Sequence, residues 1–132
     1  MTANIMKLLG IDYGDSKVGL AIADTESGVA LPYIILKNNG WNNLIEELKK
    51  IFITERIEKI IIGLPVDKNG NESEQALRVR EFSKKLNENT SIPIDYLDER
   101  FSTRQAQDLS PGRQEDDVAA MLVLQNYLDK IA

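Results

Sequence analysis

Apolar residues recur along the chain with two periods, and these periods predict its secondary structure. Three apolar runs, at residues 6–13, 17–24 and 29–36, are predicted strands, and Gly14-Asp15-Ser16 joins the first two as a hairpin turn. After the break at Asn38-Asn39-Gly40, apolar residues recur at helical spacing from Trp41 to Phe52. The first half of the chain therefore predicts three strands followed by an amphipathic helix.

The second half alternates strands and helices. Residues 57–64 form an almost uninterrupted β-branched run, which is typical of a strand buried on both faces. Asn71 followed by Glu74 resembles a capping box that opens a helix ending near residues 87–90. A strand at 92–97, a short helix at 102–109 and a final helix at 115–131 complete the predicted elements.

This order predicts an α/β fold in a single domain spanning residues 1–132. Right-handed crossovers place the fourth strand beside the first and the fifth beyond it. The expected sheet is mixed and five-stranded, in the order 3-2-1-4-5, with strand 2 antiparallel and helices flanking the sheet. Asp12 then lies on the middle strand, and Glu99, after the fifth strand, approaches it across one neighbour.

Composition narrows the chemistry. The 132 residues contain no cysteine and no histidine, which excludes disulfides, thiolate nucleophiles, imidazole bases and the usual zinc sites. No run approaches 18 apolar residues and no leader pattern is present, so we expect a soluble, cytoplasmic protein without a membrane partner. The net charge of −5 weighs against a protein that coats nucleic acid, although metal-binding carboxylates contribute charge that bound cations cancel.

Three acidic residues are candidates for a metal site. Asp12 ends a strand, Glu99 follows another, and Asp116 opens the last helix, so the three carboxylates can converge where a divalent cation offsets their repulsion. Each also has a simpler interpretation. Asp12 can cap the following turn, Asp98-Glu99-Arg100 can form a solvated ion pair, and acids in a first helical turn are favoured by the helix dipole.

Periodicity leaves one choice open, and the neighbouring polar residues suggest a substrate. The apolar face of the last helix lies midway between Asp116 and Asp117, so helical phase does not select either one. Arg100 and Arg104 suit a bidentate grip on phosphate, and Ser102 and Thr103 can cap a helix or bond a phosphate oxygen. Gly63-Leu64-Pro65 marks either a simple strand end or the sheet edge where ligands bind.

Four motifs together carry a resemblance. They are GIDYG followed by Lys17-Val18-Gly19, then IIIGLP, then DERFST, and finally Asp116 three residues before an Ala-Ala pair. In this order and at these spacings the chain resembles the YqgF family, also called RuvX-like, of the ribonuclease H-like superfamily. The resemblance covers essentially the whole sequence.

The resemblance implies a ribonuclease H-like fold and a nuclease site built from Asp12, Glu99 and Asp116, with Asp116 selected by counting back from Ala119. Two Mg²⁺ or Mn²⁺ ions would activate water and stabilise the leaving oxygen of a phosphodiester. Lys17, Arg100 and Arg104 are then candidates for binding the substrate backbone. The chain departs from the family between residues 102 and 116, where relatives tend to have a longer, lysine-rich segment.

Family members are described as Holliday junction resolvases and as nucleases maturing the 5′ end of precursor 16S ribosomal RNA. The resemblance therefore implies nucleic acid as the partner, and we favour ribosomal RNA processing in ribosome biogenesis. Cleavage of a four-way DNA junction in recombination or repair is the alternative. A non-catalytic binding module is a third possibility, which an intact acidic set disfavours. The sequence fits either a monomer or a homodimer.

Overall fold

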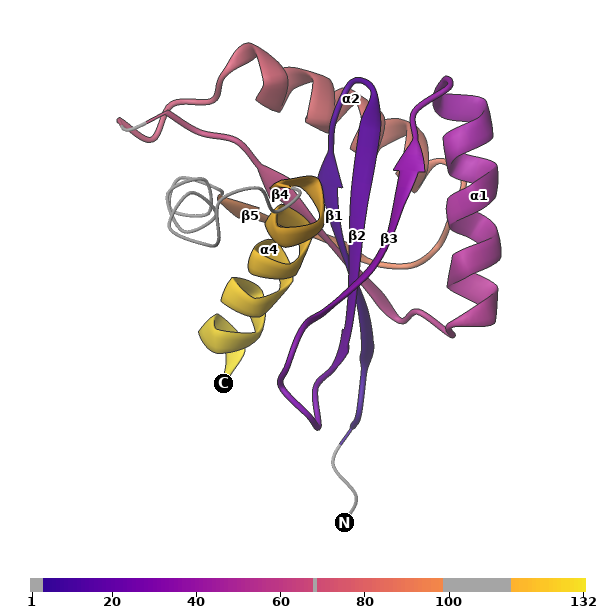
Figure 1. Cartoon of the computed structure of the whole chain (residues 1–132), viewed down its shortest axis with the longest axis vertical. Coiled ribbons are helices and arrows are strands. Elements are labelled where there is room, and N and C mark those ends of the chain that lie inside the picture. The colour runs from indigo at the N-terminus through magenta and orange to yellow at the C-terminus, as the bar shows by residue number, and fades with distance from the viewer. Residues whose placement is uncertain (1–3, 68, 99–114) are drawn as a thin grey trace.

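The computed structural model describes residues 4–67, 69–98 and 115–132, without the side chains of residues 115–117. Within this part of the chain, five strands form one sheet and three helices pack on its two faces (Figure 1). The elements are β1 (Lys7–Tyr13), β2 (Lys17–Asp24), β3 (Leu31–Lys37), α1 (Trp41–Thr54), β4 (Lys59–Leu64), α2 (Glu74–Asn87), β5 (Ile94–Asp98) and α4 (Glu115–Ile131). The predicted helix at 102–109 lies outside the described residues.

The sheet has the order β3-β2-β1-β4-β5, which confirms the predicted topology. β2 is antiparallel to β1 and β3, whereas β4 is parallel to β1 and β5. The carboxyl ends of β1, β4 and β5 therefore meet at one edge, because these three strands are parallel. One strand, β4, separates β1 from β5.

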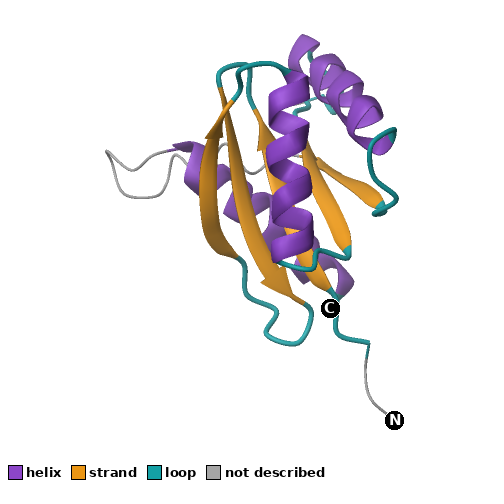
Figure 2. Cartoon of the chain, turned by 90° about the vertical axis from the view of Figure 1, so that its right-hand side faces the viewer, coloured by secondary structure: helices purple, strands orange, loops and turns teal. Residues whose placement is uncertain are grey.

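Helices cover both faces of the sheet (Figure 2), and alternate side chains of the strands divide the core into two layers. On one face, Leu9, Ile11 and Tyr13 of β1 pack in a cluster that contains the apolar residues of α1 and α2. On the other face, Leu8 packs in a second cluster that contains the apolar residues of α4. β4 contributes to both clusters, as expected of a continuous apolar strand in the middle of a covered sheet.

Gly10 fixes where α4 crosses the sheet. A Cβ atom at this position would lie 2.9 Å from Leu124 Cβ and 3.1 Å from the carbonyl oxygen of Ala120. A glycine in a strand interior often marks such a close backbone approach. The absence of a side chain at Gly10 lets α4 lie directly on β1.

The capping residue of α2 differs from the prediction. Ser73 is the N-cap, and its hydroxyl accepts a hydrogen bond from the backbone N–H of Ala76 at 3.2 Å. Asn71 instead belongs to the preceding turn, where its N–H donates to Asp67 Oδ1 at 2.9 Å. The capping box predicted from Asn71 and Glu74 is therefore wrong, because the side chain of Asp67 closes the turn before the helix begins.

β4 begins two residues later than predicted. The C-terminus of α1 is closed by the N–H of Ile57, which donates to the carbonyl of Phe52 at 3.0 Å, and by that of Arg56, which donates to Ile53 at 3.3 Å. This pair of bonds is a Schellman motif, and Arg56 takes the left-handed conformation at φ 54°. Ile57 therefore belongs to the C-terminal cap of α1 and not to β4.

β3 also starts later than predicted, at Leu31, because the side chain of Gln125 in α4 forms hydrogen bonds with the backbone before it. Its side-chain amide accepts from the N–H of Ala30 at 2.9 Å and donates to the carbonyl of Gly28 at 3.0 Å. β3 is an edge strand that leaves Leu31 58% and Ile34 44% exposed. Its pairing with β2 shifts register between Leu20 and Ala21.

None of the helices in the described part of the chain has the length and apolar character needed to cross a membrane.

Candidate active site

Asp12 lies near the carboxyl end of β1 on the face that α4 covers. Its neighbours Ile11 and Tyr13 are buried in the α1–α2 layer, so strand alternation directs Asp12 to the opposite face, where Leu8 and Gly10 also lie. The side chain is partly buried. The predicted position of Asp12 on the middle strand is confirmed.

The backbone of α4 points its first turn toward Asp12. Tyr127 lies toward the other end of β1, since Lys59, which is paired with Leu8, places its Nζ 5.3 Å from the Tyr127 ring centroid. From Ala120, which lies over Gly10, residue 116 is about 6 Å farther along the helix axis. Asp12 is likewise about 6.7 Å from Gly10 along the strand. The first turn of α4 is therefore directed toward the end of the sheet at which β1 ends.

Several predicted site residues cannot be placed. Glu99, Arg100, Ser102, Thr103 and Arg104 lie outside the described residues, and only the backbone of residues 115–117 is described. Within the described ranges, no three acidic side chains are grouped closely enough to hold a metal ion. The assignment of Glu99 and Asp116 thus stays a prediction.

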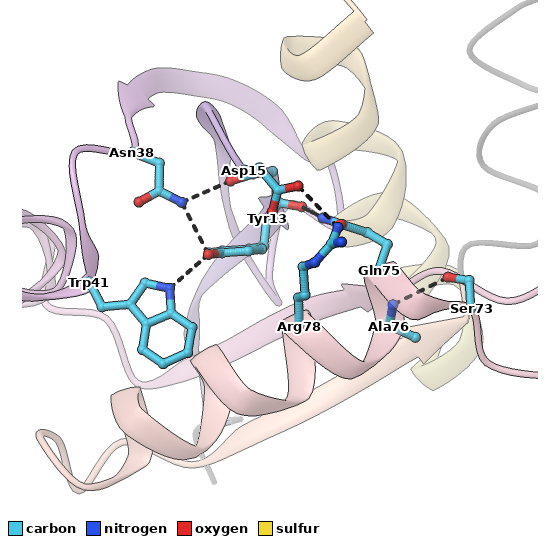
Figure 3. Close-up of polar contacts among 9 residues, drawn as sticks. Tyr13, Asp15, Asn38, Trp41, Ser73, Gln75, Ala76 and Arg78 are labelled. Carbon is cyan, nitrogen blue, oxygen red and sulfur yellow. Dashed lines mark hydrogen bonds and ion pairs between the residues drawn. The ribbon is translucent and has the colours of Figure 1, made fainter.

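Tyr13, next to Asp12, is the centre of a polar network (Figure 3). Its hydroxyl accepts hydrogen bonds from Trp41 Nε1 at 2.7 Å and from Asn38 Nδ2 at 3.1 Å. Its ring stacks on Phe82 with the centroids 4.6 Å apart. These contacts join β1 to the start of α1 and to the buried face of α2.

The backbone that follows Asp12 is also held from two sides. Asn38 Nδ2 donates to the carbonyl of Gly14 at 2.9 Å, and Gln75 Nε2 donates to the carbonyl of Tyr13 at 3.3 Å. At the hairpin tip, Arg78 of α2 forms an ion pair with Asp15 at 3.1 Å (Figure 3). Side chains from the β3–α1 loop and from α2 thus fix the strand end that carries Asp12.

Sequence reasoning did not identify Asn38, Trp41 or Gln75 as supports of this strand end. Trp41 did carry a signal, because an indole N–H that is at least partly buried usually finds an acceptor. The identity of the acceptor depends on how α1 packs against β1, which periodicity does not specify. Asn38 and Gln75 are polar residues at element boundaries, and their sequence context resembles that of ordinary turn and helix-start residues.

A charged pair with shifted pKa values lies near the amino-terminal ends of β4 and β5, away from Asp12. Lys59 Nζ is 2.8 Å from Asp95 Oδ2, which also accepts a hydrogen bond from the Tyr127 hydroxyl at 2.9 Å. The hydrogen bond from Lys59 lowers the pKa of Asp95, assisted by that from Tyr127 and opposed by burial. The hydrogen bond to Asp95 correspondingly raises the pKa of Lys59. This pair supports packing between α4 and the sheet.

Asp12 has the donor chemistry that suits a hard divalent cation. Asp12 offers carboxylate oxygens in a partly buried position, and the chain contains no histidine or cysteine that would favour a softer metal. The first turn of α4, which is directed toward the same end of the sheet, contains Glu115, Asp116 and Asp117. Carboxylate oxygens are the donors that Mg²⁺ and Mn²⁺ prefer, and the participation of the α4 acids stays a prediction.

Known proteins resemble this one in sequence over nearly the whole chain. A family model described as RuvX, Holliday junction resolvase, matches residues 6–130. A protein of Syntrophomonas wolfei named "Putative pre-16S rRNA nuclease" is 35% identical over 133 residues, covering 94% of both chains. One of Thermoanaerobacter pseudethanolicus with the same name is 36% identical, covering 94% of this chain and 96% of its own length.

Solved structures agree with the fold. T. thermophilus RuvC in complex with a Holliday junction substrate has a TM-score of 0.60 and 13% sequence identity, covering 96% of both chains. At this identity the likeness establishes the architecture alone. The expected ribonuclease H-like fold is thereby confirmed.

Proposed function

The chain belongs to the RuvX family, and we propose that it is a divalent-metal-dependent nuclease that processes the 5′ end of precursor 16S ribosomal RNA. The observation that supports this best is the position of Asp12 at the end of β1, at the end of the sheet toward which the first turn of α4 is directed. The names of relatives that are about 35% identical along the chain favour the ribosomal RNA substrate. Such a substrate implies a cytoplasmic location.

Under this proposal, Asp12, Glu99 and Asp116 hold the cations. When bound, Mg²⁺ or Mn²⁺ supplies the positive charge that stabilises in-line displacement at a phosphodiester. The protein orients the Asp12 carboxylate by holding the backbone after Asp12 through Asn38 and Gln75. Lys17, Arg100 and Arg104 bind the substrate backbone, and Ser102 and Thr103 bond a phosphate oxygen.

Cleavage of two substrates in parallel tests the proposal. End-labelled precursor 16S RNA and a four-way DNA junction are incubated in Mn²⁺ with the wild type, with Asp12→Asn, and with Glu26→Gln as a control. Glu26 is exposed in the loop between β2 and β3. This loop lies at the end of the sheet opposite to Asp12, because the end of β2 pairs with the start of β1. We expect the wild type and Glu26→Gln to cut the RNA, and Asp12→Asn to lose this activity.

Other results would favour the other functions. Paired symmetric nicks in the junction, with intact RNA, would replace the proposal by junction resolution, which calls for a symmetric dimer and is checked by sedimentation. If well-folded protein cut neither substrate, a non-catalytic role would replace it.

Metal binding provides a readout independent of turnover. A ligand that binds the native state alone raises the melting temperature. We expect Mn²⁺ to raise that of the wild type and of Glu26→Gln, but to have less effect on Asp12→Asn. An equal response of all three proteins would show that Asp12 is not a ligand.

A further inference from the structure

Lys17 and Lys37 lie directly opposite one another on neighbouring strands. They are cross-strand partners in the β2–β3 register. Their neighbours Val18 and Leu36 pack in the layer covered by α1 and α2, so strand alternation directs both lysines to the face that α4 covers. Both side chains are exposed.

The two lysines share a face and a sheet edge with Asp12. Asp12 is paired with Gly19 of β2, and Lys17 lies two residues from Gly19, about 6.7 Å along the strand. Gly19 has no side chain to fill the surface between Asp12 and Lys17. A chain of phosphates can therefore approach Asp12 and the two lysines from the same side.

Lys17 and Lys37 differ from the other lysines in the described strands, whose charges are neutralised by ion pairs with carboxylates. The described strands contain four lysines, of which Lys7 pairs with Glu55 at 3.5 Å and Lys59 pairs with Asp95 at 2.8 Å. No carboxylate in the described part of the chain forms an ion pair with Lys17 or Lys37.

Among the described residues, three acids near these lysines already have partners. Asp15, at the hairpin tip, pairs with Arg78. Glu46 and Glu47, which border the same groove as Lys37, pair with Lys49 and Lys50 at 3.9 and 3.7 Å. Like charges directly opposite each other destabilise a sheet. Lys17 and Lys37 thus form a local positive site that an anion would stabilise.

We propose that Lys17 and Lys37 together bind one backbone phosphate of the nucleic acid, next to the phosphate held at Asp12. Cα atoms of cross-strand partners are about 4.5–5.5 Å apart, so two flexible ammonium groups can converge on a single phosphate. The inference rests on the proposed nuclease function and adds Lys37 to the substrate-binding residues. It also offers a way for a chain of net charge −5 to hold a polyanion.

Salt-dependent binding measures this contact without cleavage. Precursor 16S RNA fragments in single-stranded form are titrated with Asp12→Asn protein, and with the same protein carrying Lys17→Gln and Lys37→Gln, at several salt concentrations. The matched control carries Lys7→Gln and Lys130→Gln, which removes the same charge at the opposite end of the sheet and of α4. Melting curves verify that each protein is folded.

Each phosphate contact contributes about 0.7 to the slope of log K against log salt for single strands. We expect the slope of the Lys17/Lys37 variant to be shallower by about 0.7, which corresponds to one phosphate contact. The Lys7/Lys130 control should keep the parent slope. Equal slopes for the two double variants would overturn the inference, because the effect would then be one of net charge.

Failure of the inference is distinguishable from failure of the proposed function. If the wild type cuts RNA while the Lys17/Lys37 variant retains the parent slope, the inference is wrong and the nuclease function stands. If the wild type cuts nothing while the slope changes only in the Lys17/Lys37 variant, the phosphate site stands and the nuclease proposal is wrong.

Discussion

Gly10 and Leu124 are in such close contact that a single methyl group at Gly10 would come within 2.9 Å of Leu124 Cβ. This contact holds α4 against β1 and sets the level of its first turn relative to Asp12. The relationship connects core packing to the candidate active site.

We predict that Gly10→Ala destabilises the protein by about 1–3 kcal/mol, the usual cost of overpacking a dense core. Urea unfolding measures the change. Leu124→Gly should be less harmful in the Gly10→Ala background than in the wild type, because it removes the Cβ atom that the new methyl group would meet. Strictly additive effects of the two substitutions would contradict this account of the contact.

Arg56→Gly should stabilise the protein by up to about 1 kcal/mol. Arg56 holds a left-handed conformation at the end of α1, which costs a residue with a Cβ roughly 1–2 kcal/mol and glycine very little. The flexibility of glycine in the unfolded chain offsets part of that gain. Arg56→Ala is the control and should bring no such gain in denaturant unfolding. A similar gain from both substitutions would point to the lost charge instead.

Tyr13→Phe should lower stability by about 1–3 kcal/mol while keeping the ring stacked on Phe82. The substitution leaves the indole N–H of Trp41 and one amide proton of Asn38 without their acceptor. Trp41 is the single tryptophan of the chain, so its fluorescence reports the unfolding transition. In a double-mutant cycle followed by circular dichroism, since Trp41→Phe removes the fluorophore, Trp41→Phe should cost less in the Tyr13→Phe background. An unchanged cost would show that this hydrogen bond contributes nothing.

The pair of Lys59 and Asp95 should make stability depend on pH at both extremes. The lowered pKa of Asp95 means that its contribution is complete above the ordinary value of 3.8 and is lost as pH falls through the folded-state pKa. The raised pKa of Lys59 means that its contribution is complete below 10.5 and is lost as pH rises through the folded-state pKa.

Asp95→Asn should therefore destabilise the protein at pH 6 and have a smaller effect in strong acid. Because the Asp95 side chain is 49% exposed, solvent screening limits the ion pair to less than about 1 kcal/mol. Thermal melts of the wild type and the variant across acidic pH measure this difference. A constant difference from pH 6 down to pH 2 would exclude the titration of Asp95 as its origin.

Asp116→Asn should abolish nuclease activity and weaken Mn²⁺ binding, whereas Asp117→Asn should retain most of both. The prediction follows from the spacing between Asp116 and the Ala-Ala pair in the family motif. Helix phase does not make the distinction, since the buried face formed by Ala120, Val123 and Leu124 lies midway between the two aspartates. Calorimetric titration with Mn²⁺ compares the variants. The opposite pattern would assign the metal to Asp117.

Much of the fold could be predicted because its elements have strong local signals. The continuous apolar run of β4 indicated a covered central strand, and the handedness of crossovers then fixed its place beside β1. The limits of β3 and β4 were less predictable. They depend on Gln125 from a distant helix and on Arg56 in an unusual backbone conformation, neither of which alters the hydrophobic pattern.

The candidate site was predictable only in part, for a related reason. Asp12 was found because a carboxylate in an apolar strand is costly without a partner or a cation. The opposition of Lys17 and Lys37 depends on the β2–β3 register, which the loop between these strands and the shift at Leu20 and Ala21 determine. Gly10 carried a readable signal, since an isolated glycine in a strand suggests close backbone approach.

The edge strand β3 also affects how copies of this protein behave at high concentration. An apolar edge with a free row of backbone donors is a template on which sheets of separate molecules join and aggregate. In β3 that row is interrupted twice, by Pro32, which has no N–H, and by the unmatched Tyr33 where the register shifts. The same short segment that exposes Leu31 and Ile34 thus protects the molecule from assembling through its own backbone.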